Sequence, residues 1–297
     1  MSRRRPAAAR LPLAAACEAL EGRRLMSTVT FAGTSAGEYI EVATAGQYLQ
    51  ISVGKWIGQP TKVALRVPLS KVTGVQVDAG GGQDMVVVRD GVPVAARVFG
   101  GAGDDYLYGG DKGDVLFGLD GNDFLFGGGG DDVILGGNGA DQLYGADGDD
   151  LLYGEAGDDQ LSGDGGRDRL FGGGGNDDLR GGDGDDALFG LAGDDRAAGD
   201  AGNDYIEGND GADRLAGGDG DDTVLGGAGN DVLVGDRGRD TLRGGDGNDQ
   251  LFAYDGEEEV LFGGAGYDRA DVDRRANPFL FWQPHDALVD VEGSIFG

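Results

Sequence analysis

The chain has 297 residues, 63 of them glycine, and 54 acidic residues against 24 lysines and arginines give a formal net charge of −30. This charge makes nucleic acid and anionic membrane surfaces unfavourable partners and cations favourable ones. No run of eighteen or more apolar residues occurs, so the sequence offers no candidate for a membrane-spanning helix. The single cysteine, Cys17, excludes an internal disulfide framework and a cysteine-based zinc site.

Residues 1–27 are predicted to be an export or leader segment. Four arginines, the last of them Arg10, precede a short apolar run that ends at Cys17. The residues before Cys17 have the outline of a lipoprotein cleavage box. The following residues, from Glu18 to Ser27, resemble the LEPRxLL motif found at the start of many bacterial surface and exported proteins, which implies a role in export. A short leader helix without such a role is the other interpretation.

Residues 28–99 are rich in alternating and apolar stretches that predict β-strands. Two places have the outline of degenerate repeats. Glu38 and Ile40 occupy the acidic and the inward position of one, and Asp84 and Val86 occupy them in the other. Because terminal repeats of a solenoid are commonly atypical, this segment is predicted to be an N-terminal cap. An independent β-domain that binds carbohydrate or protein is the alternative.

The stretch from Gly100 to Phe252 is one nine-residue unit, G-G-x-G-x-D-x-U-x with U a large aliphatic residue, repeated seventeen times without a gap. Position one is always Gly and position six is always Asp. Position four is Gly except at Lys112, and position eight is Leu, Ile or Val except at Ala197. In extended backbone, side chains alternate, so position eight faces inward while seven and nine face outward. A disordered glycine-rich linker would not need an aliphatic residue at every ninth position.

This nonapeptide resembles the RTX calcium-binding repeat over the whole stretch. The resemblance implies an all-β, right-handed parallel β-roll or β-helix solenoid, in which each unit forms a glycine-rich turn and a short strand and two units complete one coil. It also implies several bound Ca²⁺ ions. Each unit would then stack on the second unit after it, about 4.8 Å away, which is the strand spacing of a sheet. The aspartates of alternate units would form two columns.

The position-six aspartates are the candidate metal ligands, because carboxylates one strand spacing apart repel one another and no row of lysines faces them. Calcium binds six to eight oxygens in flexible geometry, and glycine turns can supply carbonyls. The predicted carboxylate ligands are Asp105, Asp114, Asp123, Asp132, Asp141, Asp150, Asp159, Asp168, Asp177, Asp186, Asp195, Asp204, Asp213, Asp222, Asp231, Asp240, Asp249 and Asp268. The predicted turn glycines are Gly100, Gly103, Gly127, Gly130, Gly136, Gly139, Gly172, Gly175, Gly181, Gly184, Gly217, Gly220, Gly226, Gly229, Gly244 and Gly247.

Two irregular units are expected to differ from the others. Lys112 replaces a turn glycine and brings a positive charge, so sites beside it are expected to be weak. Ala197 replaces the large aliphatic residue, so the core around it is expected to be the softest.

The register breaks between Ala253 and Phe262, and one further unit, residues 263–271, returns with Asp268 at position six and Ala270 at position eight. The calcium-binding β-roll is therefore predicted over residues 100–271. Residues 272–297 lose the glycines and gain aromatic residues, which predicts a C-terminal cap. An uncleaved C-terminal secretion signal, as carried by family members exported by type I secretion, is an equal interpretation of this tail.

An apolar band is expected on the outside of one sheet. Position nine in every second unit is occupied by Phe117, Leu135, Tyr153, Phe171 and Phe189, with Val115, Val133 and Leu151 beside them at position seven. One interpretation is a ladder of side chains that steadies parallel strands. The other is a contact patch for self-association, for a surface partner or for the N-terminal segment, since large exposed apolar patches mark interfaces.

The sequence favours no enzyme activity. His285 is the only histidine, so the chain lacks the HExxH helix of a zinc protease, and it lacks a G-x-S-x-G nucleophile elbow. The predicted function is an extracellular, secreted or cell-surface calcium-binding protein whose roll folds on Ca²⁺ binding, as a structural or surface component. A non-catalytic accessory or adhesion module of a secreted enzyme or toxin system is the alternative.

Overall fold

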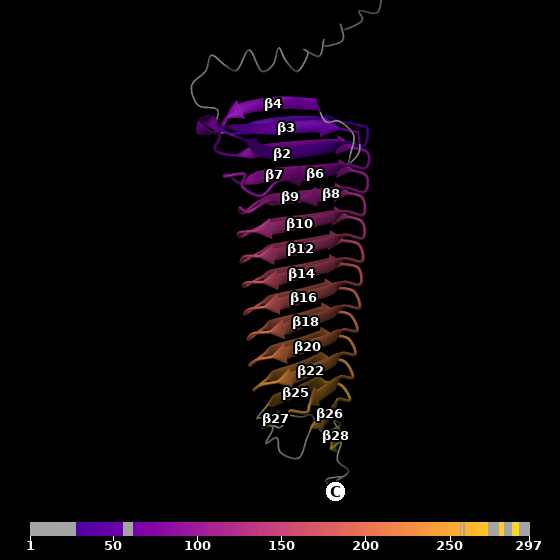
Figure 1. Cartoon of the computed structure of the whole chain (residues 1–297). Coiled ribbons are helices and arrows are strands. Elements are labelled where there is room, and N and C mark those ends of the chain that lie inside the picture. The colour runs from indigo at the N-terminus through magenta and orange to yellow at the C-terminus, as the bar shows by residue number, and fades with distance from the viewer. Residues whose placement is uncertain are drawn as a thin grey trace, which may run out of the picture.

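The structure is a computed structural model that describes residues 28–55, 62–255, 257, 259–272, 279–281 and 287–290. These residues form an all-β parallel solenoid of about 11 turns, which confirms the predicted fold class (Figure 1). Within this part of the chain the only helical element is a short 3-10 turn, Leu69–Lys71. No helix there is long and apolar enough to cross a membrane.

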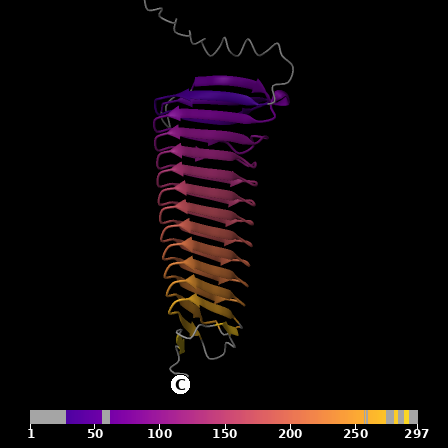
Figure 2. The same ribbon diagram turned by 180° about the vertical axis from the view of Figure 1, so that it is seen from behind.

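Two long sheets form the opposite walls of the solenoid (Figures 1 and 2). The 13-stranded sheet contains, in spatial order, β1 (Val29–Thr34), β5 (Val75–Gly81), β7 (Ala96–Ala102), β9 (Val115–Asp120), β11 (Val133–Asn138), β13 (Leu151–Ala156), β15 (Arg169–Gly174), β17 (Ala187–Ala192), β19 (Tyr205–Asp210), β21 (Thr223–Ala228), β23 (Thr241–Asp246), β25 (Val260–Ala265) and β27 (Phe279–Phe281).

The 15-stranded sheet faces the viewer in Figure 1. Its strands, in spatial order, are β4 (Lys62–Pro68), β3 (Tyr48–Gly54), β2 (Tyr39–Ala45), β6 (Met85–Val88), β8 (Tyr106–Tyr108), β10 (Phe124–Gly129), β12 (Gln142–Asp147), β14 (Gln160–Gly165), β16 (Asp178–Asp183), β18 (Arg196–Ala201), β20 (Arg214–Asp219), β22 (Val232–Arg237), β24 (Gln250–Ala253), β26 (Arg269–Val272) and β28 (Ala287–Asp290).

Alternation along each strand places the core. Ile134 pairs with Leu116 in the coil before it and with Leu152 in the coil after it, each 18 residues away. All three side chains are fully buried, and the same holds at position eight of the other units, where Ala197 keeps only 5% of its surface exposed. The expectation that position eight points inward and that two units complete one coil is therefore confirmed. A single file of aliphatic side chains from each sheet fills the interior.

The turns between strands require glycine at position four. Gly139 has a φ of 133°, in a region that L side chains rarely adopt, and a Cβ added there would overlap the carbonyl oxygen of Gly121 in the preceding coil. Position two also has positive φ, but larger residues occupy it with φ nearer 80°, as at Leu119. Stacking of carbonyls on glycines therefore sets the close spacing of the turns.

The N-terminal segment is built into the same two sheets. Strands β1, β5 and β7 extend the 13-stranded sheet, and β2 and β6 extend the 15-stranded one. Ile40 and Val86, the inward residues of the two degenerate repeats, are fully buried. At the outer end the chain turns back, so that β2, β3 and β4 pair antiparallel. The parallel stack therefore ends in a three-stranded antiparallel meander.

The C-terminal coils continue the stack after a one-residue insertion. Val260 pairs with Thr241, which is 19 rather than 18 residues earlier, and Ala270 is fully buried as expected. Strands β27 and β28 then pair parallel with β25 and β26. Residues 1–27 with Cys17 and the export motif, His285 and most of the predicted C-terminal cap lie outside the described residues.

The apolar band lies on the outer face of β9, β11, β13, β15 and β17, as expected, and its position-nine side chains are partly exposed. The rings of Tyr153 and Phe171 stack with their centroids 4.8 Å apart, and those of Phe171 and Phe189 stack at 4.9 Å. Phe99 of β7 stacks on Phe117 at 4.7 Å, which extends the band by one coil toward the N-terminus. These in-register contacts support the ladder interpretation.

If the band is a stabilising ladder, replacing Phe171 and Phe189 together with Ser removes ring contacts between adjacent coils. We expect a loss of roughly 1–2 kcal/mol of unfolding free energy, since each cross-strand pair contributes about 0.2–1 kcal/mol. Urea unfolding in saturating calcium measures this loss, and light scattering measures the molar mass. Gln142→Ser with Gln250→Ser on the other sheet is the control. An unchanged stability with a halved mass would instead identify the band as a self-association surface.

Candidate metal centre

The position-six aspartates lie where each turn enters a strand, and they form two buried columns. One column, beside the 13-stranded sheet, contains Asp114, Asp132, Asp150, Asp168, Asp186, Asp204, Asp222 and Asp240. The other, beside the 15-stranded sheet, contains Asp105, Asp123, Asp141, Asp159, Asp177, Asp195, Asp213, Asp231, Asp249 and Asp268. None exposes more than 3% of its surface. The structure thus brings the predicted carboxylates together in columns, and it buries them in the wall of the roll.

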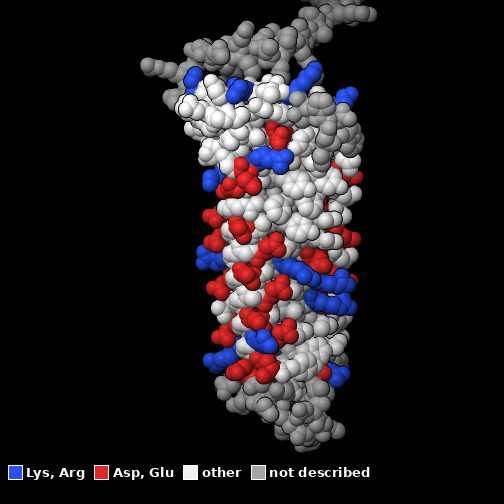
Figure 3. Space-filling view, viewed as in Figure 1, with Lys and Arg blue, Asp and Glu red and all other residues white. Residues whose placement is uncertain are grey.

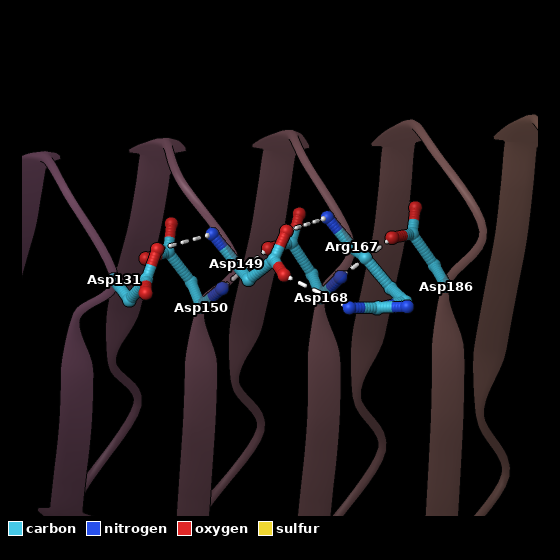
Figure 4. Close-up of polar contacts among 6 residues, drawn as sticks. All are labelled: Asp131, Asp149, Asp150, Arg167, Asp168 and Asp186. Atoms are coloured by element: carbon cyan, nitrogen blue, oxygen red, sulfur yellow. Dashed lines mark hydrogen bonds and ion pairs between the residues drawn. The ribbon is translucent and has the colours of Figure 1, made fainter.

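One oxygen of each carboxylate has a backbone partner. The Asp132 N–H donates to Oδ1 of Asp150 at 2.7 Å. The Asp150 N–H in turn donates to Oδ1 of Asp168 at 2.7 Å (Figure 4). The same bond links each aspartate to the next in its column, at 2.6–3.0 Å. Sequence reasoning missed this bond, because it considered only repulsion between side chains. The columns are therefore tied together by one hydrogen bond for each aspartate.

The second oxygen has no partner. Among the described residues, Oδ2 of every predicted aspartate except Asp114 and Asp268 is buried without a hydrogen bond. A buried, unsatisfied charged oxygen is strongly unfavourable, and it is rare in a native protein. A series of such oxygens along two columns indicates that repeated ligands, one kind at equivalent positions, contact them.

Each Oδ2 packs closely against the position-one glycine of its own unit, where a Cβ would leave it no room. A Cβ added at Gly127 would overlap Oδ2 of Asp132 and would lie 2.8 Å from the carbonyl oxygen of Gly145 in the next coil. A Cβ at Gly181 would likewise overlap Oδ2 of Asp186 and lie 2.6 Å from the carbonyl oxygen of Gly199. The predicted position-one glycines Gly100, Gly127, Gly136, Gly172, Gly181, Gly217, Gly226 and Gly244 all lie next to Oδ2 of their own unit's aspartate.

The predicted position-four glycines lie elsewhere on the turn. Gly103, Gly130, Gly139, Gly175, Gly184, Gly220, Gly229 and Gly247 all have positive φ. Apart from Gly130, which packs against Lys112 and Gly113, each would place a Cβ against the position-four carbonyl of the preceding coil. Their carbonyl oxygens therefore point along the axis of the roll between successive turns. Most repeats thus offer a carboxylate oxygen without a hydrogen bond beside turn carbonyls.

This donor set fits a hard cation. The described part of the chain contains no group of three or more His, Cys, Asp or Glu side chains placed to share a metal. A bound ion would therefore need carbonyl oxygens in addition to the aspartate, which is the mixture that calcium accepts and that nitrogen- or sulfur-preferring metals do not favour. Calcium ligation by the predicted residues remains a prediction.

Burial raises the pKa of the column carboxyls. For Asp132 burial, reinforced by the charges of Asp150 and Asp114, raises the pKa from 3.8 to about 8. For Asp105 burial raises the pKa to about 7, and for Asp123 to about 6, while the backbone N–H bond opposes the shift in both. Without a bound cation, these three carboxyls therefore take up and release protons near neutral pH.

The unit containing Lys112 has a different turn. The N–H of Gly110 donates to Oδ2 of Asp114 at 2.7 Å, while Oδ1 of Asp114 accepts from the Ala96 N–H at 2.6 Å. Lys112 does not adopt the positive φ of the position-four glycines. Both oxygens of Asp114 are thus satisfied by the protein. That a calcium site beside Lys112 is weak stays a prediction.

Two further acidic residues belong to the columns. Glu259 follows Asp240 in the column and is 1% exposed. Burial, reinforced by a side-chain hydrogen bond with Asp255, raises the pKa of Glu259 to about 8. The inserted residue before it disguised its position in the sequence. Asp84, the acidic residue of a degenerate repeat, is also buried with Oδ2 unsatisfied, and its N–H donates to Oδ1 of Asp105 at 2.7 Å.

A second ladder, which sequence reasoning missed, runs along the turns at position five. Asp131 Oδ1 accepts from the Asp149 N–H at 3.1 Å, and Asp149 Oδ1 accepts from the Arg167 N–H at 3.0 Å (Figure 4). The guanidinium of Arg167 also pairs with Asp149 at 3.1 Å. The frequent Asp and Asn at position five was the available signal. This outer ladder holds the turns in register beside the buried columns.

A family model described as the RTX calcium-binding nonapeptide repeat matches this chain. The matched residues are 99–134, 108–143, 135–170, 162–197, 189–224, 198–233 and 225–257. Together they extend from 99 to 257, which is more than half of the chain. No curated protein matches the sequence.

The raised pKa values predict that protons stabilise the calcium-free roll. Most column carboxyls have an ordinary pKa of 3.8 and a raised folded pKa, from about 6 in Asp123 to about 8 in Asp132. The stability that their protonation contributes is therefore fully present below about pH 3.8 and is lost as the pH rises through the folded pKa values. In excess chelator, we expect β content to increase as the pH falls from about 8 to 5. Circular dichroism measures this increase.

Calcium must displace those protons. We therefore also expect the calcium concentration at the folding midpoint to rise as the pH falls from about 8 to 5. Sedimentation at each pH shows whether added β signal comes from the monomer. An unchanged chelator spectrum between these pH values would contradict the assignment of raised pKa values to the columns.

Substituting Gly172 tests the space beside Oδ2. Gly172→Ala would place a Cβ on Oδ2 of Asp177, whereas Gly174→Ala in the same strand would meet no atom within 4 Å, and neither glycine has a positive φ. We expect Gly172→Ala to cost about 1–3 kcal/mol and to raise the calcium midpoint, as overpacking does. Gly174→Ala should change the unfolding free energy by less than about 0.5 kcal/mol. Equal effects in a calcium titration with urea unfolding would show that this space has no special role.

Proposed function

Because the chain belongs to the RTX calcium-binding nonapeptide repeat family, we propose that it is an extracellular protein whose β-roll folds when calcium binds and which serves as a structural or surface component. The single observation that supports the proposal best is the series of buried Oδ2 atoms without hydrogen bonds along both columns. Calcium binding by the repeats accounts for these atoms, and the fold places every one of them beside a turn.

The proposed mechanism couples folding to binding. Ordering the backbone costs about 1–2 kcal/mol per residue, and glycine loses more freedom than any other residue. The single-file core and one hydrogen bond for each aspartate oppose this cost, while the unsatisfied carboxylate oxygens add to it. A cation that contacts an Oδ2 atom and carbonyls of neighbouring turns removes the penalty and links successive coils. Binding free energy then becomes folding free energy.

Proteins with RTX repeats are generally secreted, and calcium-dependent folding suits that destination. Extracellular calcium modules commonly bind at about 10⁻⁴ to 10⁻³ M, whereas cytosolic sensors respond at about 10⁻⁷ to 10⁻⁵ M. A roll of the first type stays unfolded inside a cell and folds outside. We therefore place this chain in the extracellular space or at the cell surface.

No catalytic role forms part of this proposal, because the acidic residues of the roll are used by the repeat itself. The alternative is a non-catalytic accessory or adhesion module of a secreted enzyme or toxin system. The two differ in their expected neighbours. A surface component is retained in a cell-surface fraction, whereas an accessory module co-purifies with a separate catalytic protein.

A calcium titration of the purified full chain, followed by circular dichroism, tests the proposal. We expect little β signal in excess chelator at about pH 7.5, a cooperative rise at about 10⁻⁴ to 10⁻³ M calcium, and no comparable rise with magnesium, which demands a tighter octahedral site.

The double variant Asp150→Asn with Asp168→Asn should raise the calcium midpoint, because each amide retains an acceptor oxygen but loses the charge that attracts the ion. Asp149→Asn, at the exposed position-five ladder, keeps its acceptor oxygen and is the control. Full β content in excess chelator at this pH would refute coupled folding.

A further inference from the structure

The outer face of the 15-stranded sheet changes character along the roll. Its first coils carry aromatic rings, and the ring of Phe124 lies between those of Tyr108 and Tyr144, with centroids 5.6 Å and 5.3 Å away. Further along the sheet, Gln160 and Ser162 of β14 replace the rings. Beyond them, three arginines follow on the next strands. The face therefore offers an aromatic surface, then hydrogen-bonding groups, then positive charge.

The three arginines are Arg180 on β16, Arg196 on β18 and Arg214 on β20. All three are exposed, and Arg196 is the strand neighbour of Arg214. Within the described part of the chain, none of them has an ion pair. Figure 3 shows a cluster of Lys and Arg side chains in the right-hand half of this face, among acidic and uncharged ones. Three unpaired positive charges on adjacent strands attract an anionic group to this patch, although the net charge of −30 makes anionic partners unfavourable for the chain as a whole.

A shallow hollow of about 340 Å³ adjoins the patch. It is lined by Tyr144, Gln160, Leu161, Ser162, Asp178 and Arg180. The ring offers an apolar platform, while the amide, the hydroxyl and the carboxylate offer hydrogen bonds. The Ser162 hydroxyl donates to Oδ1 of Asp164 at 2.8 Å, which leaves its oxygen free to accept. This combination suits a sugar ring, which has an apolar face and hydroxyl groups around its edge.

From these observations we infer that the outer face of β12 to β20 binds an acidic polysaccharide that runs along the axis of the roll. One sugar lies in the hollow against Tyr144, and acidic groups of its neighbours pair with Arg180, Arg196 and Arg214. Arginine suits this role because its planar fork bonds carboxylate and sulfate oxygens in pairs. Four strand spacings, about 19 Å, separate β12 from β20, so the face spans several sugars of a linear polymer.

Other anions fit this face less well. Nucleic acid carries one charge for about every 1.7 Å of duplex, which the acidic surroundings would repel strongly. A lipid surface would need apolar side chains that insert between headgroups, and the arginines have none beside them on β16 to β20. Asp178 borders the patch and no ion pair joins it to Arg196, its strand neighbour. Each bound Ca²⁺ reduces the net negative charge, so calcium favours the approach of the polymer.

The inference rests on the proposed function in one respect, because only the calcium-folded roll aligns these side chains. The test uses the full chain in saturating calcium, with circular dichroism of every variant to show that the roll is folded. Three polymers with one backbone serve as probes: dextran sulfate, carboxymethyl dextran and neutral dextran. Biolayer interferometry measures their affinities at low and high salt, and vesicles that contain anionic lipid form a separate arm.

We expect both charged polymers to bind, neutral dextran to bind at least about tenfold more weakly, and affinity to fall with salt because exposed charge pairs are screened. Arg180→Gln, Arg196→Gln and Arg214→Gln together should weaken binding about tenfold, since each exposed ion pair contributes a few-fold. The matched control removes three arginines from other places, Arg169→Gln, Arg237→Gln and Arg243→Gln, and should change affinity less than about twofold. Tyr144→Ala should weaken binding with the arginines intact.

Several results would overturn the inference. Equal losses in the two triple variants would show that overall charge, or calcium bridging to surface aspartates, explains the binding. Binding to anionic vesicles but not to the charged dextrans would assign the patch to lipid headgroups. A folded chain that binds none of the probes would refute the inference alone, whereas a chain that stays unfolded in calcium would refute the proposed function on which it rests.

Discussion

The roll depends on one constraint: the two oxygens of each buried aspartate differ in their hydrogen bonding. Oδ1 is held by a backbone N–H of the preceding coil, while Oδ2 packs against a glycine of its own unit without a hydrogen bond. The first contact fixes the carboxylate in one orientation, so the second oxygen is presented at the same place in every coil. A file of single aliphatic residues is a thin core, and it leaves much of the stability to whatever satisfies Oδ2.

The nine-residue period made most of the fold accessible from the sequence. Positions that alternate in and out, the two-unit coil and the columns all follow from it, and the structure has them. Where the chain departs from this period, the position of a residue in the coil could not be predicted from the sequence. Glu259 was overlooked because one inserted residue moved it to 19 residues after Asp240, and a search in steps of nine could not reach it. The strand register identifies Glu259 as a member of the column, because Val260 pairs with Thr241 and Glu259 therefore lies opposite Asp240.

Hydrogen bonds within the columns were harder to foresee for another reason. A sequence shows which side chains repeat but not which way a backbone N–H points, so the aspartates were expected to repel one another without relief. The position-five ladder escaped notice because Asp, Asn, Ala and Arg alternate there, and only the geometry shows that the first two accept from the next turn. The bond from Gly110 to Asp114 in the unit of Lys112 was not foreseen either.

The coil of eighteen residues, with two different walls, also limits how such a chain can change in length. Loss or duplication of one whole coil returns each remaining side chain to its own wall, so Phe171 would still lie above another outward residue of the same sheet. A change of nine residues exchanges the walls beyond that point, and arginines would meet the ring ladder. Repeats should therefore be gained or lost two at a time during evolution. A single extra repeat or a short insertion is tolerated best near an end of the roll, as with the residue inserted between Ala253 and Val260.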